Sequence, residues 1–318
     1  MLLGHQKQWQ FLKESFFLGR IPHALLFSGE EKLGKKTLAI EFIKFINCLE
    51  KDFSLRLTPY RNEVSGAGPC QKCLSCQAIE RRIHPDFIFI EPIDNEIQVS
   101  QIRDLSLKLS EKPSFSSFKT AILDKAHLMN QEAQSAFLKT LEEPKGNTIL
   151  ILITEYPERL FSTILSRVQK IKFYPVKKEE IEKFLKERKI PKEEIEGMIK
   201  ISLGKPGLIY DFLKNPEKLK EKKEKIRELI KILNSPISFR FQYAKELASQ
   251  NNLGEVLTIW LDYFRNILLS KLRGEGKEGK YSLLKLKNIL RQIQRINFLI
   301  STTNVNQRLA LEILLLEL

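Results

Sequence analysis

A glycine-containing loop between an apolar run and a helical pattern constrains the fold of this chain more than any other feature. The apolar run covers 24–27, and residues 36–48 carry apolar side chains at the spacing of a helix. The loop between them spans Gly29 to Thr37 and includes Gly34, Lys35 and Lys36. A strand, such a loop and a helix form the context in which phosphate-binding loops occur, so this segment predicts an α/β domain.

The alternation of apolar runs and helical patterns continues through the first half of the chain. Apolar runs at 87–90, 120–124 and 149–153, together with the segment 168–173, predict four further strands. Ser100 and Asn130 are the expected N-caps of two intervening helices. Because parallel strands need crossover connections, this alternation indicates a parallel sheet covered by helices on both faces. We therefore expect residues 1–174 to form one α/β domain.

Beyond residue 175 the sequence predicts helices only. A small helical domain over 175–214 is expected to contain helices at 178–188, 193–203 and 206–213. A third, all-helical domain over 215–318 is expected to contain helices at 216–231, 239–250, 254–272, 283–301 and 306–318, with a loop at 273–280. The apolar content of 283–318 suits either a subunit interface or the core of this domain.

The residues of the glycine loop predict a weakened nucleotide site. In a phosphate-binding loop, glycines such as Gly29 and Gly34 turn backbone N–H groups toward phosphates, and a lysine such as Lys35 reaches the terminal phosphates. The next residue normally offers a hydroxyl to Mg²⁺, but here it is Lys36, and Thr37 follows about 100° further round the helix. We expect nucleotide to bind weakly or not at all, with a plain strand-to-helix turn as the alternative.

A second acidic motif points the same way. Asp124 ends an expected buried strand, where it would belong to the same vestigial nucleotide site. Lys125 follows it, at the position where a hydrolytic ATPase would carry its water-activating carboxylate. A protonated ammonium cannot act as a general base, so hydrolysis at this chain's own site is not expected. A helix-capping role for Asp124 is the alternative.

All four cysteines of the chain fall into one candidate metal site: Cys48, Cys70, Cys73 and Cys76. Four thiolates suit tetrahedral Zn²⁺ and leave no open position for catalysis, so the metal would be structural and would fix a module at about 48–76. Four cysteines in 318 residues are too few for a disulfide scaffold. Free thiols or an iron–sulfur cluster are the alternatives, and His84 is a reserve ligand.

Charge and hydropathy limit the cellular setting. The net charge of +14 favours contact with polyanions, although lysine-rich surfaces are often only solvated. The apolar run at 149–153 is far shorter than the roughly 20 residues of a membrane span, and the N-terminal residues lack the pattern of a secretory signal. We therefore expect a globular protein of the cytoplasm, without a membrane partner.

Taken together, these motifs resemble the AAA+ subunits of clamp loaders. The resemblance spans the chain and also rests on segments outside the glycine loop and the cysteines. These segments are Gly4-His5-Gln6, Pro22 to Phe27, Asp124 to His127, Phe137 to Pro144, Thr163 to Arg167 and Asn306 to Glu312. Phe137 to Pro144 and the Ser-Arg pair are together quite specific to this family.

The resemblance implies an AAA+ core, a helical lid and a C-terminal collar through which five subunits form an open ring. Such rings load a sliding clamp onto primed DNA and bind ATP between neighbouring subunits. Arg167, with Ser166, would then be an arginine finger for the ATP of the adjacent subunit. Position 168 is usually cysteine in this element, and Val168 departs from that pattern without removing the charged residue. Spacing alone would make Arg167 a surface charge.

Three departures from the family pattern predict a stationary subunit without ATPase or polymerase activity of its own. Hydrolysing subunits carry other residues at the positions of Lys36, Lys125 and Gly207. The resemblance implies gamma/tau and delta clamp-loader subunits as partners, with the sliding clamp and primer-template DNA met through the assembled complex. The alternatives are an active ATPase subunit of the gamma/tau or replication factor C type, and a zinc-stabilised DNA-binding module.

Overall fold

The computed structural model of the chain describes residues 3–50, 68–249, 252–272, 274, 281–303 and 305–318. It divides into two compact units, the first comprising Met1–Ile181 and Gly204–Gly207, the second Glu182–Leu203 and Leu208–Leu318. Residues 51–67 of the expected zinc module, and the expected loop 273–280 apart from Gly274, lie outside the described residues. The division into domains 1–174, 175–214 and 215–318 stays a prediction.

The first unit is built on a five-stranded parallel sheet, as the alternation of strands and helices predicts. Its strands are β1 (Ala24–Ser28), β2 (Phe87–Ile90), β3 (Lys119–Leu123), β4 (Thr148–Thr154) and β5 (Gln169–Lys172). They are arranged in the order β2-β3-β4-β1-β5. The register pairs Leu26 of β1 with Leu152 of β4 on one side and with Lys170 of β5 on the other.

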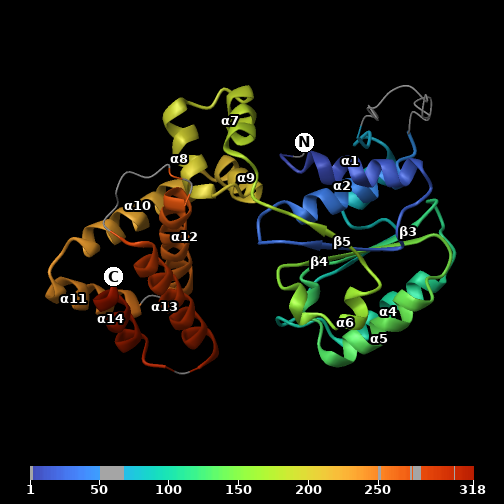
Figure 1. Cartoon of the computed structure of the whole chain (residues 1–318). Helices are drawn as coiled ribbons and strands as arrows, with labels where there is room; N and C mark the ends of the chain where they lie inside the picture. The colour runs from blue at the N-terminus through green and yellow to red at the C-terminus, as the bar shows by residue number, and fades with distance from the viewer. Residues whose placement is uncertain (1–2, 51–67, 250–251, 273, 275–280, 304) are drawn as a thin grey trace. The chain divides into compact units, whose positions relative to one another are not determined.

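Helices cover both faces of this sheet (Figure 1). One face carries α1 (Gln6–Phe17), α2 (Lys35–Asn47) and α3 (Leu74–Glu80), and the other carries α4 (Val99–Ser110), α5 (Gln131–Glu142) and the short α6 (Ser162–Leu165). Alternate strand residues point to opposite faces of the sheet. Leu25 and Phe27 therefore belong to the apolar core beneath α1, α2 and α3, while Leu26 belongs to the core beneath α4, α5 and α6. Strands buried on both faces need the near-continuous apolar runs seen in the sequence.

Two local features differ from the sequence-based expectation. Helix α1 was not predicted, and it packs Leu12 against the sheet core. The N-cap of α4 is Gln98 rather than Ser100, because the side chains of Gln98 and Gln101 form a reciprocal capping box. Asn130 caps α5 as predicted, accepting a hydrogen bond from the Ala133 N–H at 2.8 Å.

The chain after β5 is helical as predicted. The helices are α7 (Lys178–Glu187), α8 (Lys192–Ser202), α9 (Pro206–Lys214), α10 (Pro216–Leu233), α11 (Ile237–Ala248), α12 (Leu253–Leu272), α13 (Leu283–Thr302) and α14 (Gln307–Glu317). The core of the second unit surrounds Trp260 and Phe264 of α12 and includes Leu286 of α13 and Leu314 of α14. Much of the apolar content of 283–318 therefore builds this core.

None of the described helices is long and apolar enough to cross a lipid bilayer.

Candidate functional site

The glycine loop connects β1 to α2 and is held by its own lysine. Gly34 precedes α2 with φ 89°, a left-handed conformation that glycine adopts at little cost. The buried Lys35 ammonium donates hydrogen bonds to the backbone oxygens of Gly29 and Glu30. Burial lowers the pKa of Lys35, and Glu155 is first among the nearby carboxylates that oppose this shift. The lysine that would reach phosphates thus folds back onto the loop.

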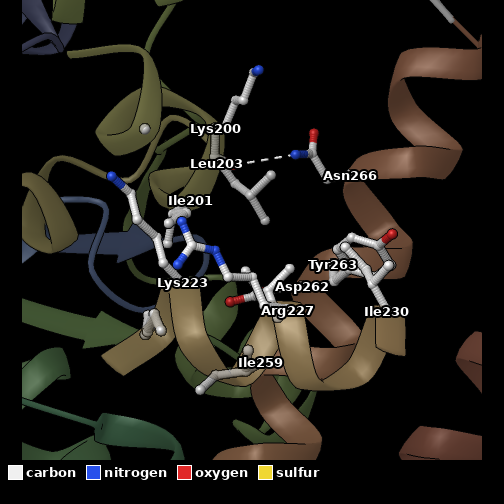
Figure 2. A pocket seen from close by; sticks show the side chains of 13 residues that line it. Lys200, Ile201, Leu203, Lys223, Arg227, Ile230, Ile259, Asp262, Tyr263 and Asn266 are labelled. Carbon is white, nitrogen blue, oxygen red and sulfur yellow. Dashed lines mark hydrogen bonds between the residues drawn. The ribbon is translucent and has the colours of Figure 1, made fainter. Parts of the chain in front are cut away.

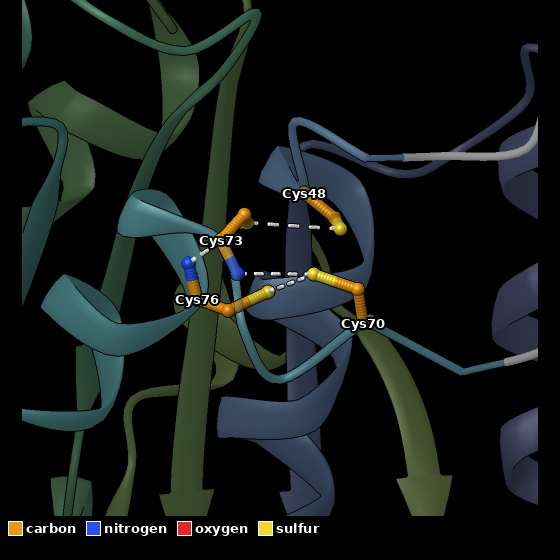
Figure 3. Close-up of side chains that lie close together, drawn as sticks. All are labelled: Cys48, Cys70, Cys73 and Cys76. Carbon is orange, nitrogen blue, oxygen red and sulfur yellow. Dashed lines mark hydrogen bonds between the residues drawn. The ribbon is translucent and has the colours of Figure 1, made fainter.

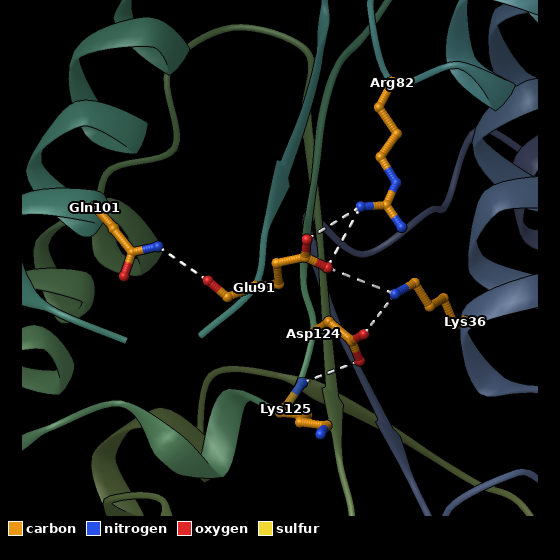
Figure 4. Close-up of polar contacts among 6 residues, drawn as sticks. All are labelled: Lys36, Arg82, Glu91, Gln101, Asp124 and Lys125. Atoms are coloured by element: carbon orange, nitrogen blue, oxygen red, sulfur yellow. Dashed lines mark hydrogen bonds and ion pairs between the residues drawn. The ribbon is translucent and has the colours of Figure 1, made fainter. Parts of the chain in front are cut away.

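Lys36 occupies the position of the missing hydroxyl and contacts the acidic motif directly (Figure 4). Its Nζ atom lies 2.8 Å from Asp124 Oδ2 and 3.9 Å from Glu91 Oε2. Thr37 is exposed to solvent. The second oxygen of Asp124 accepts a hydrogen bond from the Lys125 N–H at 3.1 Å. A lysine ammonium therefore sits on the carboxylate that, in a hydrolytic site, would help to hold the metal ion.

The Lys36 ammonium has further partners that the sequence did not indicate. Nζ lies 4.6 Å from the centre of the Phe89 ring, and the Arg82 guanidinium lies 3.9 Å from the same ring centre. Arg82 also contacts both carboxylate oxygens of Glu91 at 3.4 Å. These contacts fix Lys36 between an aromatic face and two carboxylates.

The alternative helix-capping role of Asp124 is wrong, because Lys125 is the N-cap of the short helix 126–128 and no side chain caps it.

The segment 204–207 packs on the glycine loop within the first unit. The Gly207 N–H donates to the Lys32 backbone oxygen at 2.7 Å, and Lys205 Nζ lies 3.1 Å from Glu30 Oε2. A Cβ atom at position 207 would approach the same Lys32 oxygen to 2.8 Å. The clamp-loader resemblance implies an arginine at this position in hydrolysing subunits, and that side chain would not fit here without a shift of the loop. Sequence reasoning identified the substitution but not this contact.

Arg167 follows α6 and is held in a defined position. Its Nη2 lies 2.9 Å from Glu142 Oε1 at the end of α5, and its Nη1 donates to the Thr163 backbone oxygen at 3.0 Å and to Ser166 Oγ at 3.2 Å. The side chain remains 38% exposed. The guanidinium is thus oriented by its neighbours yet accessible from outside the unit.

The sheet places Arg167 and the glycine loop at opposite edges. β1 and β5 are parallel, with Leu25 beside Gln169 and Ser28 beside Lys172. The loop follows the carboxyl end of β1, whereas Arg167 precedes the amino end of β5. Strands of this length separate the two edges by roughly 13 Å. Arg167 is therefore placed away from the loop of its own chain.

The four cysteines converge as predicted (Figure 3). Cys48 follows α2, Cys70 and Cys73 precede α3, and Cys76 lies in its first turn. All four sulfur atoms lie within 4.8 Å of one another, with 3.9 Å between Cys48 and Cys73 and 4.0 Å between Cys70 and Cys76. Sulfurs bound tetrahedrally at about 2.3 Å from zinc lie about 3.8 Å apart. The cluster thus has the donors and spacing for a metal ion.

Backbone N–H groups support negative charge on this sulfur cluster. Cys70 Sγ accepts from the Cys73 N–H at 3.2 Å, and Cys73 Sγ accepts from the Cys76 N–H at 3.4 Å. Although burial opposes the shift, hydrogen bonds from the N–H groups of Cys76 and Leu49 lower the pKa of Cys73 to about 6. A thiolate rather than a thiol is what binds metal.

The reserve ligand His84 is not part of the sulfur cluster. Its Nε2 lies 3.2 Å from both Ser75 Oγ and Ser116 Oγ, and its Nδ1 accepts from the Asp86 N–H at 3.1 Å. Burial lowers the pKa of His84, although Asp86 opposes the shift. His84 instead joins Ser75 of α3 to Ser116 in the loop before β3.

The strand order, the glycine loop after β1 and the arginine before β5 define a P-loop domain of the AAA+ class. The sequence model of the family described as "DNA polymerase III, delta subunit" matches residues 4–177. The chain belongs to this family of clamp-loader subunits. The clamp-loader resemblance seen in the sequence is thereby confirmed.

Individual relatives carry the names of two kinds of subunit. The chain is 35% identical over 181 residues to the DNA polymerase III subunit delta' of Bacillus subtilis, covering 57% of this chain and 51% of that protein. It is 35% identical over 185 residues to the DNA polymerase III subunit gamma of Buchnera aphidicola, covering 58% and 47%. The chain thus spans about half the length of the curated relatives it matches. A solved gamma subunit-related protein of Thermotoga maritima has a TM-score of 0.47 and 17% identity, covering 96% and 97% of the two chains.

Proposed function

We propose that this chain is the non-hydrolysing, delta-prime subunit of a bacterial replicative clamp loader. In this role it joins gamma/tau and delta subunits in a five-membered ring in the cytoplasm. The ring loads the sliding clamp onto primer-template DNA. The chain lies beside the ATP site of the adjacent motor subunit and contributes an arginine to that site. It does not hydrolyse ATP itself. Residues 1–174, 175–214 and 215–318 act as AAA+ core, lid and collar.

The contact between Lys36 and Asp124 is the observation that carries the non-hydrolysing role. A hydrolytic loop needs Mg²⁺ beside the terminal phosphates, and the cation now next to Asp124 is an ammonium at 2.8 Å. Lys35 binds the carbonyls of its own loop, and the Gly207 N–H donates a hydrogen bond to the loop at the Lys32 oxygen. Gly29, Gly34, Lys35, Thr37 and Asp124 are then the remains of a nucleotide site that binds ATP weakly or not at all.

The position of Arg167 supports a role toward a neighbouring subunit. It lies at the amino-terminal edge of the sheet, away from its own glycine loop, and Glu142 and Ser166 hold it while leaving it accessible. A guanidinium placed beside the γ-phosphate of a neighbour would stabilise charge that develops in the transition state of phosphoryl transfer. Arginine suits this task because its planar group donates in a fixed geometry.

The sulfur cluster fits a structural Zn²⁺ held by Cys48, Cys70, Cys73 and Cys76. Four thiolates fill a tetrahedral shell, so the metal would supply cross-linking and no open position for substrate. It would join the end of α2 to the start of α3.

An ATPase assay of the assembled complex tests the proposed role. We expect no ATP turnover by the chain alone, and turnover in a mixture with gamma/tau and delta subunits, clamp and primed DNA. Arg167→Ala should lower that turnover by about 10³-fold or more while the complex still assembles. Arg159→Ala is the matched control, because Arg159 is exposed and stacks on Tyr156. Unchanged turnover with Arg167→Ala would contradict the arginine-finger role.

A motor subunit is the second candidate, since the match to a gamma subunit has the same 35% identity as the match to a delta' subunit. ATP turnover by the isolated chain would favour it. A zinc-stabilised DNA-binding module predicts instead that the isolated chain binds DNA tightly, with an affinity that falls steeply with salt.

A further inference from the structure

A pocket of about 540 Å³ lies within the second unit, between α8, α10 and α12 (Figure 2). Its volume falls in the range of pockets that bind small organic molecules. The walls are mainly apolar, and the buried Ile259 of α12 belongs to them. The other apolar wall residues are Ile201, Leu203, Ile226, Ile230 and Tyr263. None of the residues that line this pocket belongs to the glycine loop, to the surroundings of Arg167 or to the sulfur cluster.

Cationic side chains dominate the polar part of this pocket. Lys200, Lys222, Lys223 and Arg227 line it, and Asp262 is the one carboxylate among its lining residues. Lys223 and Arg227 are four residues apart on α10, so they share one face of that helix, and Figure 2 shows both side chains reaching toward α8. Cations beside an apolar wall favour a ligand that brings both negative charge and apolar surface.

Gly197, in the interior of α8, makes room for one of these cations. A Cβ atom at position 197 would lie 2.7 Å from Lys223 Nζ and 2.8 Å from its Cε. Glycine in a helix interior is destabilising relative to alanine, so α8 carries a locally unfavourable residue where the Lys223 side chain lies against it. The absence of a side chain at 197 therefore leaves room for the Lys223 ammonium beside α8.

Leu203, the C-cap residue of α8, forms part of the pocket wall. Leu203 follows α8 with φ 51° and ψ 33°, a left-handed conformation that is uncommon outside glycine, asparagine and aspartate. Asn266 of α12 donates from Nδ2 to the Lys200 backbone oxygen at 3.2 Å and so ties α12 to the last turn of α8. Strained backbone of this kind persists where the surrounding structure holds it, and such positions cluster at ligand sites.

We propose that this pocket binds a small organic anion with an apolar body. Its acidic group lies between the Lys223 ammonium and the Arg227 guanidinium, and its apolar body lies against Ile226, Ile259 and Tyr263. Binding joins α8 to α10 and α12 and stabilises the second unit, because a ligand that binds only the folded state raises its stability. The proposal does not depend on the clamp-loader role.

A displacement assay on the full chain tests the pocket. The probe is 8-anilinonaphthalene-1-sulfonate, an aromatic sulfonate whose fluorescence rises in apolar surroundings, and the competitor is decanoate. We expect decanoate to displace the probe far better than inorganic phosphate, which lacks an apolar body, or decanol, which lacks the charge. Phosphate competing as well as decanoate would reduce the site to a charged patch, and decanol competing equally would reduce it to an apolar one. Either result would overturn the proposal.

Three variants place the binding at this pocket. Arg227→Ala should weaken the affinity for decanoate about tenfold, the effect of losing a hydrogen bond to a charged group. Gly197→Ala, which keeps the charge but displaces the Lys223 ammonium, should weaken it several-fold. Lys220→Ala removes one charge from an exposed position of the same helix outside the pocket and should have no effect. Equal affinities in Arg227→Ala, Lys220→Ala and the unmodified chain, all with unchanged Tm, would overturn the assignment.

Discussion

The ammonium of Lys36 lies 2.8 Å from the carboxylate of Asp124, so the first turn of α2 forms an ion pair with the end of β3. Asp124 is largely buried and Lys36 is 37% exposed, which keeps this pair only partly screened by water. Phe89 and Glu91 hold the ammonium from further sides. A fixed monovalent cation at this place competes with Mg²⁺ for the same carboxylate.

Replacing Lys36 by threonine should restore a response to Mg²⁺ and ATP. The change frees Asp124 and adds the hydroxyl that a metal site requires. At ATP about ten times above Kd, binding would add about 1.4 kcal/mol, or a rise in Tm of about 3 °C. Lys36→Ala is the control, because it frees Asp124 without supplying a hydroxyl. A thermal shift assay showing an equal Mg²⁺-dependent rise for the unmodified chain would contradict this interpretation.

Glu142 should act as a positioning residue for Arg167. Glu142→Gln removes the charge partner that holds Nη2 at 2.9 Å, so the guanidinium would sample more orientations. We expect the ATP turnover of the assembled complex to fall by up to about tenfold, less than with Arg167→Ala. The neighbouring Glu143→Gln makes the same charge change at an exposed position and should leave turnover unaltered. Equal rates for the two glutamate variants would argue against this role.

The strands and the sulfur cluster could be predicted from sequence because their signals are local. Buried parallel strands require apolar runs such as that of β4. The close spacing of Cys70, Cys73 and Cys76 is typical of metal-binding cysteines and is visible in the sequence itself. The Gly207 contact with Lys32 and the Glu142 contact with Arg167 join residues far apart in the chain or separated by a strand. The residue pattern within one segment does not encode contacts between distant residues. These two contacts could therefore be identified only from the structure.

Asp86 should make a large contribution to the stability of the first unit. It is fully buried and accepts hydrogen bonds from the N–H groups of Ser114, Phe115 and Ser116 at 2.7–2.8 Å. In Asp86→Asn, an amide N–H₂ would face one or more of these donors. We expect the free energy of unfolding to fall by about 2–3 kcal/mol at pH 7, measured by urea denaturation.

The effect of Asp86 should disappear in acid. Burial raises the pKa of Asp86, but the three N–H groups and His84 outweigh it and lower the pKa below the ordinary value. A carboxyl whose pKa is lower in the folded state binds protons more readily when unfolded. Its stabilisation is therefore complete above the unfolded pKa of about 4 and is lost as pH falls through the lower folded value. The difference between Asp86→Asn and the unmodified chain should shrink across that range, and a difference that persists unchanged at pH 2 to 3 would contradict this account.

Removal of zinc should release the end of α2 from the start of α3 without unfolding the first unit. The sulfur cluster lies at one end of α2, while the sheet has its own apolar cores on both faces. We expect the purified chain to hold about one zinc, and a strong chelator to release it, expose four thiols to a thiol reagent and lower Tm by several degrees. Cys70→Ser should reduce the zinc content.

His84→Ala is the matched control. It should keep the zinc, because His84 contacts Ser75, Ser116 and the backbone of Asp86 rather than the sulfur cluster. It should nevertheless lower the stability of the first unit, because those contacts are lost. A chain that contains no metal, or a His84→Ala variant that loses it, would contradict the assignment of the four cysteines as the complete ligand set.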